Sequence, residues 1–203
     1  NAAPRLREIK VTMPATAFDQ FLAEWIEPEI AKRATGAVEA LGTLGLERKT
    51  MVRFILSRLA QYADEQASGV SKSLQSYWEH EIEHVLPNTP TAAILAAFDQ
   101  PAGYHQYKQR LGNLLLLEKA INVVVGQDFL AEKRSEYLKS NLLMTRAFAI
   151  SQSVGVNTAF SRIARFFTAY PNEVHPAWDS AAIMARQMEL AQLAGAVFGY
   201  TRL

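Results

Sequence analysis

Two segments in the N-terminal third of the chain repeat apolar residues at three- and four-residue steps, the spacing of one face of an α-helix. The first predicts a helix over residues 15–33 that ends near Gly36, with Pro28 as a point where it would kink. The second predicts a helix from Met51 to Gly69, because glycine commonly follows a helix end. We interpret both helices as scaffold.

The period changes to two over residues 76–86, which is the alternation typical of a β-strand. Apolar side chains fall on one face and acidic ones on the other, namely Glu79, Glu81 and Glu83. Pro87 is the expected end of the strand. In a regular strand Glu83 and His84 point to opposite sides, so both reach one point only if the strand twists, bulges or ends there.

Beyond residue 90 the pattern is mainly helical. Residues 91–110 are expected to hold a helix over 92–98 and a turn over 101–103. The apolar run 114–117 fits either a buried strand or a helix segment, and the preceding Gly112, together with the resemblance given below, favours a strand. Asp128 is the expected N-cap of a helix that reaches Leu138. The C-terminal part predicts three more helices, over residues 142–150, 157–170 and 176–198.

Length and composition indicate a folded protein. The chain has 203 residues, of which 49% are hydrophobic, enough for one domain or a closely packed pair with a substantial core. It has no cysteine, which excludes disulfides and cysteine-based zinc sites. We found no membrane-spanning run and no signal sequence, and expect a cytoplasmic protein without a membrane partner. The first residue is Asn1 and not Met, so we expect a fragment of a larger protein.

The net charge of +1 excludes a general electrostatic attraction to nucleic acid, so any affinity for DNA must come from local clusters of charge. Basic residues do gather in one part of the chain: Lys108, Arg110, Lys119, Lys133, Arg134, Lys139 and Arg146. Acidic residues lie inside this region. Acid surrounded by base is typical of a metal site that holds phosphate groups.

The residue types around His84 are those that phosphodiester hydrolysis needs. An imidazole has a suitable pKa to deprotonate water, and oxygen ligands such as Glu83 and Asn122 favour Mg²⁺ or Mn²⁺. Glu81 or Glu79 are alternative carboxylate ligands. Asn113 is expected to orient the imidazole or the loop, as a second layer of contacts does in many sites.

Several motifs together resemble a known family. They are YWEHEIEHVLP at residues 77–87, LGNLLLL at 111–117, and Asn122, Lys133, Tyr137 and Ser140. The pattern resembles the C-terminal HNH-type nuclease domain of GmrSD-like restriction enzymes, and it covers roughly residues 50–200. Members recognise modified DNA, and relatives act in phosphorothioate-linked phage defence.

The resemblance implies a ββα-metal fold, with His84 in the first strand, residues 114–117 as the second, and Asn122 at or before the helix. It also implies an N-terminal nucleotide-hydrolysing or sensor domain as the partner within the full protein. We therefore expect a mainly α (α+β) fold with three parts: a helical part over residues 1–70, a ββα-metal nuclease core over 71–140, and a second helical part over 141–203.

The predicted function is metal-dependent DNA cleavage within a modification-dependent restriction or phage-defence system. His84 and Asn113 are the predicted catalytic residues, and Glu83 and Asn122 the predicted ligands of Mg²⁺ or Mn²⁺. DNA is expected to contact Lys119, Lys133 and Arg134.

Other interpretations of the same residues stay open. The module can be a degenerate nuclease fold that binds DNA or a partner without cutting, or a zinc hydrolase that uses His80 and His84. Asn113 can be a turn residue at positive φ and Asn122 a helix cap. Lys133 and Arg134 can form the solvated face of a helix. The remaining expectations are that three tryptophans lie in the core, namely Trp25, Trp78 and Trp178, and that a buried Arg186 requires an acidic partner.

Overall fold

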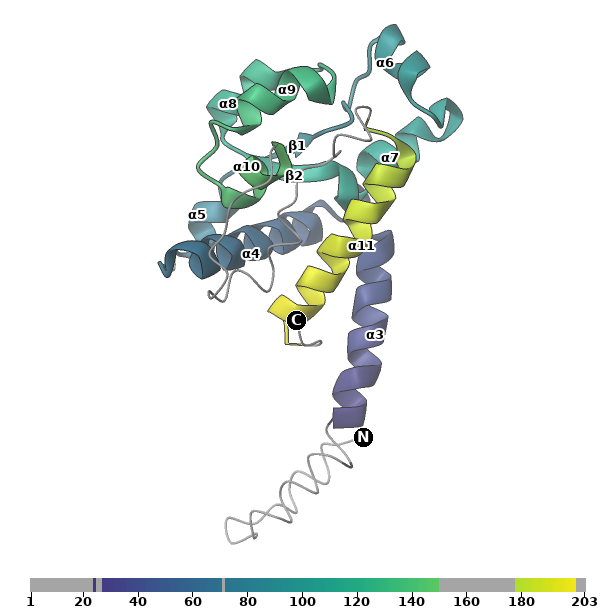
Figure 1. Cartoon of the computed structure of the whole chain (residues 1–203). Coiled ribbons are helices and arrows are strands. Elements are labelled where there is room, and N and C mark those ends of the chain that lie inside the picture. Colours follow the sequence, from purple (N-terminus) through teal and green to yellow (C-terminus); the bar gives the residue numbers. More distant parts are fainter. Residues whose placement is uncertain (1–23, 25–26, 71, 150–177, 200–203) are drawn as a thin grey trace, which may run out of the picture.

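A two-stranded sheet lies between two groups of helices in the computed structural model, which describes residues 24, 27–70, 72–149 and 178–199 (Figure 1). The elements before the sheet are α3 (Glu27–Thr43), η2 (Leu46–Arg48), α4 (Lys49–Ser68) and α5 (Leu74–Trp78). The strands are β1 (Glu81–His84) and β2 (Leu114–Leu117), separated by α6 (Ala92–Ala97), η3 (Pro101–Gly103), α7 (Tyr104–Gln109) and η4 (Leu111–Asn113). After the sheet come α8 (Lys119–Val125), α9 (Leu130–Tyr137), α10 (Leu143–Ala149) and α11 (Ser180–Val197).

The strands pair antiparallel, with Glu81 opposite Leu117 and His84 opposite Leu114. The predicted strand at residues 114–117 is thus confirmed. Residues directly opposite each other point to the same face of a sheet. The face with Leu114 and Leu116 packs on α4 in what we call the α4-side core, whose members include Val52, Leu56, Leu59 and Leu114. The other face belongs to the α9-side core, whose members include Leu115, Leu117, Leu130, Tyr137 and Phe148.

The first strand is shorter than the sequence pattern predicts. Residues 76–78 belong to helix α5, whose N-cap Ser73 accepts a hydrogen bond from the Ser76 N–H. Tyr77 is fully buried, and its hydroxyl donates to Asp64 Oδ2 at 3.2 Å. This anchor and the cap favour a helical turn over the strand that alternation predicts, and they leave Trp78 only half-buried.

Helix α3 does not end near Gly36 as predicted but continues to Thr43. It packs along α11 (Figure 1), and the Gln187 side chain of α11 donates to the carbonyls of Leu41 and Leu44 at 2.9 Å each. These bonds satisfy carbonyls at the end of a helix, and tertiary contact thereby outweighs the low helix propensity of glycine. Trp25 and the start of the predicted helix lie outside the described residues.

Several other predicted helices are present, whereas α7 and α8 were not predicted. Helix α4 ends at Gly69 as predicted, with φ 68° and its N–H donating to Glu65 O. The short helix and turn of the insertion are confirmed as α6 and η3, and α10 and α11 fall in two of the predicted C-terminal helices. Residues 157–170 and Pro176 lie outside the described residues. Within the described ranges, no helix has the length and apolar character needed to span a membrane.

The cap of α9 differs from the prediction. Phe129, in extended conformation, precedes the helix, and its carbonyl accepts from the N–H groups of Glu132 and Lys133. Asp128 therefore lies one residue before the N-cap, where no side-chain cap bond forms.

Candidate functional site

Asn113 fixes the loop that follows His84. Its side chain is completely buried, and Oδ1 accepts from the Leu86 N–H at 2.7 Å and from Trp178 Nε1 at 2.8 Å. Nδ2 donates to the carbonyls of Leu86 and Lys108, both at 3.0 Å. Asn113 does not have positive φ, so its interpretation as a turn residue at positive φ is wrong. Its side chain holds the loop, and its predicted catalytic role stays a prediction.

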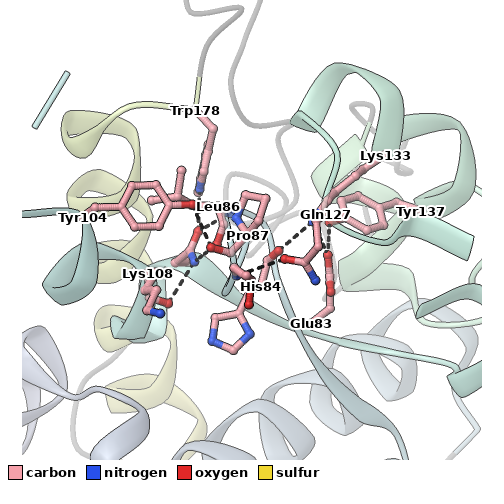
Figure 2. A network of polar contacts seen from close by, with 12 residues as sticks. Glu83, His84, Leu86, Pro87, Tyr104, Lys108, Gln127, Lys133, Tyr137 and Trp178 are labelled. Carbon is pink, nitrogen blue, oxygen red and sulfur yellow. Dashed lines mark hydrogen bonds and ion pairs between the residues drawn. The ribbon is translucent and has the colours of Figure 1, made fainter. Parts of the chain in front are cut away.

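Two further side chains hold the same loop. The Tyr104 hydroxyl donates to Pro87 O and Lys108 Nζ donates to Asn88 O, each at 2.7 Å. Burial raises the pKa of Tyr104 above its usual value, so this phenol remains a hydrogen-bond donor. Two residues of α7 therefore hold the chain segment beyond β1 (Figure 2).

The turn before Asn113 rests directly on α11. Gly112 N donates to Gln187 Oε1 at 2.9 Å, while Arg186 donates to the carbonyls of Gly112 at 2.6 Å and Leu114 at 2.8 Å. A Cβ at Gly112 would lie only 2.1 Å from Ile183 O, so glycine is required for this close approach.

The expectation that Arg186 needs an acidic partner is wrong. Its partners are main-chain carbonyls, and its guanidinium also lies 4.9 Å from the centre of the Phe148 ring. Carbonyl dipoles and an aromatic face stabilise a cation without a carboxylate. Burial lowers the pKa of Arg186 to about 10, which leaves it protonated at neutral pH.

His84 points toward the α4 side of the sheet, because it pairs with Leu114. Its Nε2 is buried and has no hydrogen-bond partner among the described residues. Burial lowers the pKa of His84 to about 4, and the positive charges of Lys108 and Lys133 act in the same direction. The imidazole is therefore neutral at neutral pH and has a lone pair able to accept a proton.

Glu83 points to the opposite face, and Figure 2 shows its carboxylate and the His84 ring directed away from each other. Its Oε1 accepts from Lys133 Nζ at 2.7 Å and from the Tyr137 hydroxyl at 3.0 Å. Burial raises the pKa of Glu83 above its usual value, while Lys133 and Tyr137 act to lower it. The structure thus does not bring the Glu83 carboxylate and the His84 imidazole together.

Lys133 is almost completely buried, 1% exposed, so neither a solvated face nor an accessible phosphate contact describes it in this structure. Besides the ion pair with Glu83, its Nζ donates to the main-chain carbonyl of His84 at 2.8 Å. Lys133 therefore joins α9 to both residues at the end of β1. A lysine on a short helix gives no sequence signal for such burial.

The other predicted site residues lie on α8 and α9. Asn122 is half-buried inside α8, where its N–H donates to Glu118 O, so it is not a helix cap. No hydrogen bond within the described ranges joins Asn122 to Glu83 or His84. Lys119 is exposed at the first turn of α8, and Arg134 is half-buried on α9.

The described residues do not fit a preformed metal centre. Among them, no group of three or more histidine, aspartate or glutamate side chains is arranged to hold an ion. Glu83 is already paired with a buried ammonium group, and Glu81, two positions earlier on the strand, shares its face. The zinc interpretation needs a third ligand beside His80 and His84, and the described part of the chain provides no such group of three. Metal binding stays a prediction.

Two contacts of the site escaped sequence reasoning. Trp178 is buried as predicted, but its indole N–H also donates to Asn113, 65 positions earlier in the chain. Gln187 bridges Gly112 to the end of α3. No local sequence pattern predicts either contact, since both depend on how α11 packs against the rest of the protein.

The sequence also matches a known protein family. Residues 39–193 match the family described as GmrSD restriction endonucleases, C-terminal domain. The match covers well over half of the chain and includes both strands and all the residues discussed above, so the protein is a module related to restriction endonucleases. It belongs to the GmrSD C-terminal domain family. Searches of curated proteins and of solved structures gave no match.

Proposed function

We propose that this module is a DNA endonuclease in which His84 is the general base. The observation that carries the proposal is a neutral imidazole whose Nε2 has no hydrogen-bond partner among the described residues, located where β1 enters a loop held by Asn113. Such a base would accept a proton from the water that attacks the phosphodiester. A nearby phosphate anion would raise the pKa of His84 from about 4 toward the range in which a general base is effective.

We further propose that cleavage requires Mg²⁺ or Mn²⁺, because membership of a restriction-endonuclease family implies phosphodiester chemistry. A hard cation would supply charge neutralisation at the phosphate. In the observed arrangement the Glu83 carboxylate does not fit as its ligand, so we assign no step of the reaction to the metal.

DNA would approach through cationic side chains that remain accessible. Lys119 is exposed, Arg134 is half-buried, and Lys108 lies close enough to His84 to lower its pKa. These groups suit phosphates better than base edges, so sequence preference should be weak and binding sensitive to salt. Selection of modified DNA, and phage defence, would then depend on an N-terminal nucleotide-hydrolysing or sensor domain.

Incubation of the protein with supercoiled plasmid tests this function. Nicked or linear product in the presence of Mg²⁺ or Mn²⁺, and none with EDTA, is the expected result. The rival function is a degenerate module that binds DNA without cutting, and the ion-paired state of Glu83 favours it. Retention of plasmid on the protein without any cleavage under either metal would support that rival.

A further inference from the structure

Three polar groups meet on the α9 side of β1. Glu83 Oε1 accepts from Lys133 and Tyr137, and Lys133 also donates to the carbonyl of His84. The Lys133 and Glu83 side chains are 0% and 8% exposed. Lys133 thus contacts the main-chain carbonyl of His84, and the His84 side chain points to the opposite face of the sheet (Figure 2).

We propose that Glu83 and Lys133 form a positioning pair that fixes the main chain of His84, and that Glu83 is not a metal ligand. For its kinetic consequences the proposal rests on the function proposed above. Lys133 orients His84 through the carbonyl, and Glu83 acts only by holding the Lys133 ammonium group in place.

The surroundings explain why the two charges belong together. Tyr137 contacts Phe148 edge to face at 5.9 Å, and the neighbours include Leu115, Leu130 and Val85 of the α9-side core. A lone charge in such surroundings is strongly unfavourable, whereas an ion pair with additional hydrogen bonds is tolerated. Removal of either partner therefore disturbs the end of β1.

The same geometry argues against a cation at Glu83. A magnesium ion that coordinates a carboxylate lies about 2.0–2.1 Å from its oxygen. In this structure the Lys133 Nζ already lies 2.7 Å from Glu83 Oε1. Strand alternation also directs His84 to the other face. A metal bound to Glu83 would consequently be separated by the sheet from the base that the reaction needs.

A double-mutant cycle tests the proposal with Glu83→Gln, Lys133→Met and the combined variant. Lys133→Met should lower kcat for plasmid nicking by about 10–100-fold with little change in KM, since a misplaced base costs that much. The combined variant should lose no more than Lys133→Met alone, because Glu83 acts through Lys133. The metal concentration that gives half-maximal rate should be the same in Glu83→Gln and in the wild type.

A matched control is the ion pair Glu136–Lys139 on α9 and just beyond it, whose lysine and glutamate side chains are 61% and 19% exposed. Glu136→Gln with Lys139→Met should keep the wild-type rate. A higher metal requirement in Glu83→Gln, or losses that multiply in the combined variant, would overturn the proposal. If Lys133→Met does not fold, the metal requirement of Glu83→Gln alone decides.

Failure of the proposed function gives a different result. If the wild-type protein cuts no DNA, the proposed nuclease function is refuted. The Glu83–Lys133 pair can still be tested by thermal unfolding and by the NMR signal of the His84 ring. Each single variant should lower the thermal midpoint and shift this signal, and the combined variant should lower the midpoint by less than the sum of the two. If the decreases in thermal midpoint of the two single variants add up exactly in the combined variant, the two residues do not act as a pair and the proposal is contradicted.

Discussion

Asn113 pairs with both main-chain polar groups of Leu86: Oδ1 accepts from the Leu86 N–H at 2.7 Å and Nδ2 donates to the Leu86 carbonyl at 3.0 Å. The Asn113 side-chain amide thus provides the two hydrogen bonds that a neighbouring strand would otherwise make to Leu86, just after β1 has ended. Because Leu86 lies two residues after His84, this side chain, together with Tyr104 and Lys108, holds the chain that leaves the candidate base.

Asn113→Ala should lower the free energy of unfolding by about 3 kcal/mol, since each buried polar group without a partner costs roughly 1–3 kcal/mol. The groups that lose Asn113 as a hydrogen-bond partner are the Leu86 N–H and C=O, the Lys108 C=O and the Trp178 indole N–H. Chemical denaturation measures the change. Asn141→Ala, at an exposed asparagine, is the control and should change little. A similar small effect from both variants would refute the structural role given to Asn113.

Gly112→Ala should prevent α11 from docking on η4, because the added Cβ would meet Ile183 O at 2.1 Å and Gln187 N at 2.9 Å. Loss of cooperative thermal unfolding, or a large fall in its midpoint, is expected. Gly36→Ala is the matched control: a Cβ added there would have nothing within 4 Å, and α3 should gain about 1 kcal/mol. A Gly112→Ala protein as stable as the wild type would show that the close approach is not real.

Stability should fall as the pH drops from 6.5 toward 4, through His84. The folded protein holds the pKa of His84 at about 4, below the ordinary 6.5, so in this range the unfolded chain binds a proton that the folded protein does not. The stabilisation is complete above pH 6.5 and is lost toward pH 4. Glu83, with a raised pKa, acts in the opposite direction at acidic pH.

Comparison with His84→Gln isolates the histidine contribution to this pH dependence. Denaturation curves at several pH values should show a weaker loss of stability on acidification in the variant. An NMR titration of the wild type should give a His84 midpoint near pH 4. A midpoint near 6.5 would contradict the buried, neutral imidazole.

Local patterns were enough to predict the parts of the site that lie close in sequence. Strand alternation identified the segment that carries Glu83 and His84, although β1 is shorter than predicted, and Gly112 together with the family resemblance favoured a strand at β2. The predicted convergence of the Glu83 and His84 side chains on one site is wrong, because the strand stays regular and its register sends them to opposite faces. Helix α4 and its end at Gly69 followed from periodicity.

Features that depend on tertiary contact were not predictable in this way. Lys133 lies on a short helix with little amphipathic character, and lysine is almost never fully buried unless it is paired. Its burial follows from Glu83, 50 positions earlier. Arg186 found carbonyl partners in η4 and β2 and not an acid, since the docking of α11 determines what surrounds it.

The most direct test of the account is the single-turnover rate of plasmid nicking by His84→Ala, with His80→Ala as the matched histidine control. His84→Ala should cut at least about 100-fold more slowly while it still binds DNA, in line with the usual contribution of a general base. His80→Ala should keep the wild-type rate. Equal cleavage by the wild type and by folded His84→Ala would contradict the assignment of His84 as the base.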